Sequence, residues 1–241
     1  MSWDFALILI FLTVAVPWLG RRRIRQLFAM PQTTKMDRLS LYASTIAFQW
    51  LATSLILWRT TAHGIRPEQL GLAIPAPRVT IVAAIVLSAL ILLNQIFSLR
   101  RIAANPSEIK GILPQLALKV FPQDGVERLA FFALVATVAV CEEIIYRGFV
   151  QFCFLSWSGN IVLAGIIGSA LIFALAHLYQ GRRGLASTAL IGLLFSAIRA
   201  STGSVLAPLV AHFVADLAAG FLAPVKLRAA LSSQDTHRTL C

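Results

Sequence analysis

Two adjacent glutamates and an arginine lie in an apolar part of the chain, where charged side chains are costly. Glu142, Glu143 and Arg147 fall within residues 138–149, and most of the other residues there are hydrophobic. On insertion scales, each charge at the centre of a lipid bilayer costs about 2.5–3.5 kcal/mol. Charges are kept in such a segment when they pair with one another or take part in chemistry, so these residues are the first candidates for a functional site.

Two later apolar segments each carry a histidine. His177 follows Phe173 by four positions and His212 precedes Asp216 by four, so each pair shares one face of a helix. An aspartate at this spacing can accept a hydrogen bond from an imidazole nitrogen and fix the tautomer of the ring, and Phe173 can pack beside His177. Carboxylates and imidazoles that converge from different membrane helices are the groups that general acid–base hydrolysis uses.

The spacing of the charged residues predicts how they divide their roles. Glu143 and Arg147 stand at i and i+4, in the favourable order for an ion pair, and Glu142 is rotated by about 100° from Glu143. One glutamate can therefore face the histidines while the other is held by Arg147. If a hairpin turns at about residue 158, Glu142 lies opposite residue 174, one helical turn from His177.

The composition excludes an ordinary soluble domain. The chain has 241 residues, of which 58% are hydrophobic and 13% charged, with a mean hydropathy of +0.79. Soluble domains carry about 25% charged residues. The formal net charge of +11 comes from Lys and Arg at the ends of apolar segments, a pattern that sets membrane orientation. We therefore expect contact with membrane lipids and no nucleic-acid partner.

The apolar windows predict an all-α fold, a polytopic transmembrane helical bundle with about seven spans. We divide it into N-terminal transmembrane helices and an inner loop at 1–126, a membrane core with the candidate site at 127–223, and a polar cytoplasmic tail at 224–241. The first and sixth spans are short for a straight crossing. The expected spans are 4–19, 39–58, 79–98, 134–157, 160–178, 185–200 and 203–223.

The distribution of basic residues predicts the orientation. The loops that follow the first and third spans hold most of the Lys and Arg residues, including Arg21–Arg23 and Arg100–Arg101. Loops rich in Lys and Arg stay on the cytoplasmic side. We therefore expect the N-terminus outside and the C-terminus inside, with the candidate site open toward the inside.

The charged and histidine motifs, in this order, resemble those of a known family. They are similar to the motifs of the CAAX protease and bacteriocin-processing (CPBP) family, intramembrane glutamic endopeptidases related to the eukaryotic type II CAAX prenyl endopeptidase. The resemblance covers about residues 127–220, and Glu127 fits the family's pattern. Asp216 departs from the prenyl endopeptidases, which usually have Asn there. The matching motifs are Glu142-Glu143-x-x-x-Arg147, Phe173-x-x-x-His177 and His212-x-x-x-Asp216.

The resemblance implies an endopeptidase of the bacterial cytoplasmic membrane that hydrolyses peptide bonds in membrane-associated proteins or peptides. Glu142 would act as the base that activates water, assisted by His177. His212, oriented by Asp216, would face the developing oxyanion. The mechanism implies no metal and no other cofactor. The supporting residues are Glu143, Arg147 and Phe173.

Three alternatives remain open from the sequence. Glu142, His177 and His212 could bind zinc as a two-histidine, one-carboxylate site of a metalloprotease. Buried Glu and His chains also serve as proton relays in proton-coupled transporters, although this sequence has no repeated halves. The third alternative is a membrane scaffold or immunity factor without catalysis.

Overall fold

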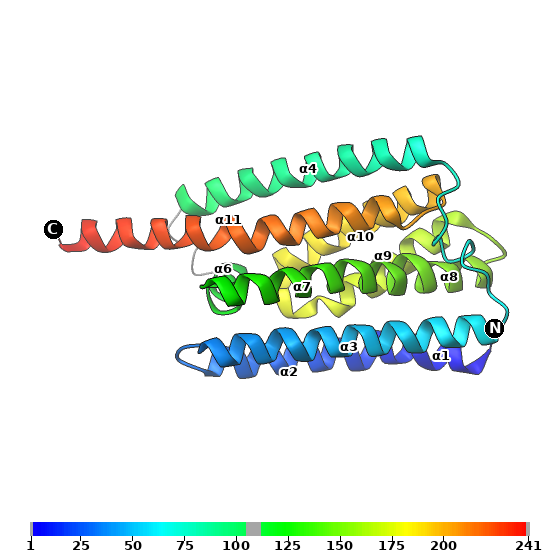
Figure 1. Cartoon of the computed structure of the whole chain (residues 1–241), viewed down its shortest axis with the longest axis horizontal. Coiled ribbons are helices and arrows are strands. Elements are labelled where there is room, and N and C mark those ends of the chain that lie inside the picture. Colours follow the sequence, from blue (N-terminus) through cyan, green and yellow to red (C-terminus); the bar gives the residue numbers. More distant parts are fainter. Residues whose placement is uncertain (1, 105–111, 240–241) are drawn as a thin grey trace.

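The computed structural model describes residues 2–104 and 112–239, and within these ranges it is all-helical (Figure 1). Six helical segments are long and apolar enough to cross a membrane, and a shorter apolar helix accompanies them. The predicted multi-pass helical bundle is confirmed. The elements are α1 (Trp3–Ile10), the π-helical η1 (Phe11–Ala15), α2 (Val16–Ala29), α3 (Lys35–Ala62), α4 (Pro77–Ala104), α6 (Ile112–Val120), α7 (Gly125–Glu142), the π-helical η2 (Glu143–Val150), α8 (Gln151–Trp157), α9 (Val162–Ala176), the 3₁₀-helical η3 (Leu178–Gln180), α10 (Gly181–Thr202) and α11 (Leu206–Thr239).

The lengths of three spans differ from those expected. The first runs as one helix over Trp3–Ala29, and the sixth extends over Leu178–Thr202, so neither is short. The short one is the fifth, α9, with 15 residues. An apolar window ends at the first arginine, whereas the helix continues because arginine can bury its stem and extend its charged head to the interface. A hydropathy window therefore underestimates the length of a helix whose ends carry basic residues.

The helices pack as layers around α7. Helix α3 lies along one side of α7, α11 lies along another side, and α4 covers α11 (Figure 1). Helix α9 packs along α10 and against η2. A Cβ on Gly192 of α10 would come within 3.2 Å of the Ala170 Cα, so the absence of a side chain there lets the two helices approach closely. Helix α1 begins at one end of the bundle and α11 ends at the other.

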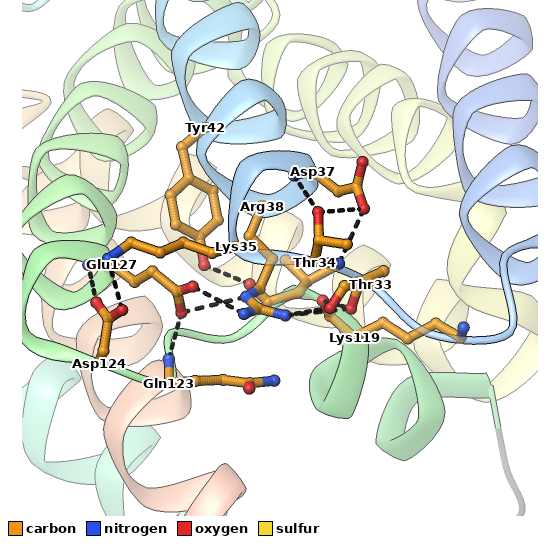
Figure 2. A network of polar contacts seen from close by, with 11 residues as sticks. Thr33, Thr34, Lys35, Asp37, Arg38, Tyr42, Lys119, Gln123, Asp124 and Glu127 are labelled. Atoms are coloured by element: carbon orange, nitrogen blue, oxygen red, sulfur yellow. Dashed lines mark hydrogen bonds and ion pairs between the residues drawn. The ribbon is translucent and has the colours of Figure 1, made fainter.

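A buried ion pair fixes the start of α7 against the start of α3. Arg38 donates to both carboxylate oxygens of Glu127, with Nη2–Oε1 at 2.7 Å and Nε–Oε2 at 3.1 Å, and the two side chains are 5% and 1% exposed (Figure 2). Asp124 caps α7 by accepting the Glu127 backbone N–H. This hydrogen bond, together with one from Lys35, lowers the pKa of the Asp124 carboxyl.

The same network holds α6, which lies in the region expected to be an inner loop. The Tyr42 hydroxyl donates to the Val120 carbonyl, and the Thr33 hydroxyl donates to the Lys119 carbonyl (Figure 2). Both acceptors are at the C-terminal end of α6, where the helix leaves carbonyl groups without intrahelical partners. The hairpin between α2 and α3 is therefore tied to α6 and to α7 at one end of the bundle.

The loop of residues 63–76 covers the opposite end of the bundle. Leu70 is buried, and its carbonyl oxygen would lie 3.2 Å from a Cβ on Gly148, so the loop rests directly on η2. Arg199, in the last turn of α10, donates to the Gln69 carbonyl at 2.7 Å. The loop is thus held against two elements of the membrane core.

Removing one partner of the Arg38–Glu127 pair is expected to destabilise the protein strongly. Glu127→Gln leaves a buried guanidinium without its counter-charge, and such changes cost about 3–5 kcal/mol. Lys35→Met is the matched control, because it breaks the Lys35–Asp124 pair, in which each side chain is 45% exposed. Exposed pairs contribute about 0–1 kcal/mol. Unfolding of the purified protein in mixed micelles measures both, and equal losses would contradict the importance of the buried pair.

Candidate active site

The glutamate–arginine motif lies where α7 gives way to a π-helix. Helix α7 ends at Glu142, and η2 begins at Glu143. A π-helical turn disrupts the regular pattern of backbone hydrogen bonds, and such turns occur often at functional sites. The Tyr146 carbonyl accepts a hydrogen bond from the Ser169 hydroxyl of α9 at 2.7 Å, and Ser169 in turn accepts one from Ser196 of α10. The neighbouring helices therefore stabilise the irregular turn.

Glu143 is fully buried and contacts two partners with one oxygen. Its Oε1 lies 3.0 Å from Arg147 Nη1 and 2.9 Å from His212 Nδ1. The predicted Glu143–Arg147 ion pair is present, and both side chains are 0% exposed. The Arg147 guanidinium also lies over the ring of Phe173, 4.1 Å from its centroid, which favours a cation in a dry site. Phe173 packs against His177 as well, with centroids 4.6 Å apart.

His212 stands between three carboxylates. Its Nδ1 contacts Glu143, while its Nε2 is 3.5 Å from Asp216 Oδ2 and 4.0 Å from Glu142 Oε2. The sequence predicted that Asp216 orients this ring, but Glu143 makes the shorter contact and is buried, whereas the Asp216 side chain is 42% exposed. The i, i+4 spacing brings Asp216 near the ring, and Glu143 of η2 makes the shorter contact that orients the ring.

The two oxygens of Glu142 have different surroundings. Its Oε1 accepts a hydrogen bond from Gln49 Nε2 at 2.9 Å. Its Oε2 is buried and has no hydrogen-bond partner among the described residues. In that part of the chain, Glu142 contacts Gln49 and His212. No hydrogen bond or ion pair joins it to His177, the partner expected from the sequence. The hairpin count could not predict the direction of these side chains.

His177 lies at the end of α9, where the helix changes to η3. Its Nδ1 donates to the Phe173 carbonyl at 2.8 Å. The other ring nitrogen, Nε2, is then the one that can accept or donate a proton in the cavity. His177 thus has one nitrogen fixed by the backbone and one available for chemistry.

All four predicted catalytic residues line one cavity of about 1170 Å³. Glu143, Arg147 and Phe173 do not line it, in agreement with supporting roles behind the cavity wall. The cavity extends past the side chains of α2 and α6, at the end of the bundle where α3 begins (Figure 1). Its walls are mostly apolar side chains from α2, α3, α6 and α7. The catalytic candidates are Glu142, His177, His212 and Asp216.

The sequence analysis missed Gln49. This residue of α3 is 9% exposed, contacts Glu142 and lines the cavity. A glutamine in the middle of an apolar span was a visible signal, because buried amides in membranes are rare without a partner. The sequence offered no way to choose that partner.

The zinc alternative requires Glu142, His177 and His212 to converge on one ion. In residues 2–104 and 112–239, no three side chains of His, Cys, Asp or Glu are placed to hold one metal ion. No hydrogen bond or ion pair joins Glu142 to His177 in those ranges, and the Nδ1 of His212 contacts Glu143.

Comparison with known proteins gives one match. Residues 125–218 match the family model described as "Type II CAAX prenyl endopeptidase Rce1-like". No curated protein and no solved structure matches the chain. The matched segment contains all three motifs on which the resemblance was based, and it supports a membrane protease of the CAAX type. Residues 125–218 are thus similar to a type II CAAX prenyl endopeptidase family model, in agreement with the resemblance carried by the three motifs.

Proposed function

We propose that the protein is an intramembrane endopeptidase in which Glu142 activates water to cleave membrane-associated proteins or peptides. The observation that carries the proposal is the position of Glu142. It lines the cavity, and its Oε2, which has no hydrogen-bond partner among the described residues, is 4.0 Å from His212 Nε2. A water molecule at hydrogen-bond distance from both atoms fits this separation. A carboxylate placed in this way can act as a general base.

These positions support the following reaction. Glu142 Oε2 takes a proton from water, and the hydroxide oxygen attacks the carbonyl carbon of the scissile peptide. His212 donates its Nε2–H to the oxyanion that forms, while Glu143 holds its other nitrogen. A proton then passes from Glu142 to the leaving nitrogen, with His177 as the relay, and the C–N bond breaks. The products are a carboxylate and an amine.

The cavity supports a substrate that is partly apolar. Its walls come mostly from apolar side chains, and it is large enough for an extended peptide segment beside the catalytic residues. Its extension toward α2 and α6 provides a path for water and for the polar part of a substrate. The substrate class is therefore a membrane-associated protein or peptide.

Glu142→Gln is expected to abolish cleavage while the protein still folds. The amide cannot take a proton from water, and loss of a general base costs about 10²–10⁴-fold in rate. Cleavage of a reporter peptide by the purified protein measures the effect, and Glu68→Gln in the exposed loop is the matched control. Activity above about a tenth of wild type in Glu142→Gln would exclude this base. A transporter or a scaffold would show no cleavage even in the wild-type protein.

Chelation is expected to leave the activity unchanged. A base that acts without metal needs no zinc, so dialysis against a strong chelator should not alter the rate of cleavage. Elemental analysis of the purified protein provides the second measurement. About one zinc per chain, lost together with activity in His177→Ala, would favour the metal-dependent mechanism instead.

The cavity is expected to open toward the cytoplasm. Basic residues gather at the end of the bundle that holds the loop after α2, and cytoplasmic loops carry an excess of Lys and Arg. Single cysteines at Arg66 and Arg182, both exposed, test this in a variant without the native cysteines. A membrane-impermeant thiol reagent added to intact cells should label position 66 and spare position 182. The reverse pattern would show the inverted orientation.

A further inference from the structure

Helix α3 contributes a side chain to the candidate site, although it lies outside the segment that matches the family. Gln49 stands in the middle of α3, is 9% exposed and donates its Nε2–H to Glu142 Oε1 at 2.9 Å. The family match begins at residue 125, so it assigns no role to this helix. A polar group at this depth is costly unless it is hydrogen-bonded, and Glu142 provides the acceptor.

The contact with Gln49 gives the two oxygens of the Glu142 carboxylate different surroundings. Oε1 is held by Gln49, while Oε2 has no hydrogen-bond partner among the described residues and faces His212 Nε2 at 4.0 Å. A glutamate side chain has several rotatable bonds, so an unrestrained carboxylate would present either oxygen, or neither, to a water molecule. Holding one oxygen fixes where the other one points.

We propose that Gln49 is a positioning residue that orients Glu142 for the activation of water. The inference rests on the proposed function, because it gives Gln49 its role through the base. Catalytic geometry depends on second contacts of this kind, since a misplacement of about 1 Å can lower a rate by about 10²-fold. The N-terminal helices are then part of the active site as well as its wall.

A purely structural role is the competing explanation, and the chain offers a matched control for it. Trp50, the next residue of α3, donates its Nε1–H to the Thr137 hydroxyl of α7 at 3.2 Å. This hydrogen bond joins the same two helices, but neither residue lines the cavity. Thr137→Val removes the acceptor with little change of shape and leaves Glu142 untouched. If Gln49 only fastens α3 to α7, the two sites should respond alike.

The experiment compares Gln49→Leu with Thr137→Val in the purified full-length protein. Gln49→Leu is expected to lower kcat by about 10- to 100-fold with KM within about twofold, because the base is misaligned while the cavity stays intact. Thr137→Val is expected to keep kcat within about twofold of wild type. Thermal unfolding of each variant shows whether the fold is retained.

A third variant separates the donor from the shape of the side chain. In Gln49→Glu the introduced carboxyl group can donate to Glu142 only while it carries a proton, and two adjacent carboxylates share a proton more readily as the pH falls. The activity of Gln49→Glu relative to wild type should therefore rise as the pH falls from about 8 to about 6. A residue with only a packing role would show no such change relative to wild type.

The outcomes distinguish this inference from the proposed function. If the wild-type protein cleaves nothing, or Glu142→Gln remains active, the proposed function fails, and the positioning role fails with it. If the wild-type protein cleaves and Glu142→Gln does not, but Gln49→Leu loses no more kcat than Thr137→Val, the positioning role alone is overturned. A loss confined to KM or to thermal stability would overturn it too, because it would identify Gln49 as a packing residue.

Discussion

The candidate site depends on one buried carboxylate. Glu143 is fully buried, and its Oε1 contacts both Arg147 and His212. A guanidinium without a counter-charge would be very costly at this depth, so Arg147 requires Glu143. The same carboxylate sets the direction of the His212 ring. The same Glu143 oxygen therefore compensates the charge of Arg147 and orients His212, so a change at Glu143 affects both residues.

The Glu143–Arg147 pair lies within the π-helical turn η2. Arg147 must meet Glu143 in the interior, and its guanidinium lies against the ring of Phe173 from α9. The turn from Glu143 to Val150 leaves the regular α-helical hydrogen-bond pattern, and Ser169 satisfies the Tyr146 carbonyl. Helices α7, α9, α10 and α11 thus meet at a few polar contacts within an otherwise apolar core. These contacts specify how the helices sit against one another, which apolar packing in a membrane does only weakly.

The sequence predicted the helices and four residues that line one cavity, but not the contacts between their side chains. Hydropathy identifies spans because every backbone group in a bilayer must be satisfied within a helix. The i, i+4 spacing correctly paired Glu143 with Arg147 and placed Asp216 beside His212. It could not show that Glu143 also reaches His212, because that contact depends on how α11 is rotated against α7. The sequence also could not show that Gln49 contacts Glu142, because the two residues are 93 positions apart and lie on different helices.

The two neighbouring glutamates illustrate how a membrane protein can keep a reactive carboxylate. Glu143 is compensated by Arg147 and does not line the cavity, whereas Glu142 lines it; each carboxylate has one oxygen without a hydrogen-bond partner in the described part of the chain. A single glutamate could not serve both purposes, because a carboxylate held by a guanidinium is a poor base. Adjacent positions on a helix point in different directions, so one can face Arg147 while the other faces the cavity. In the proposed mechanism, the two adjacent glutamates therefore separate charge compensation, by Glu143, from water activation, by Glu142.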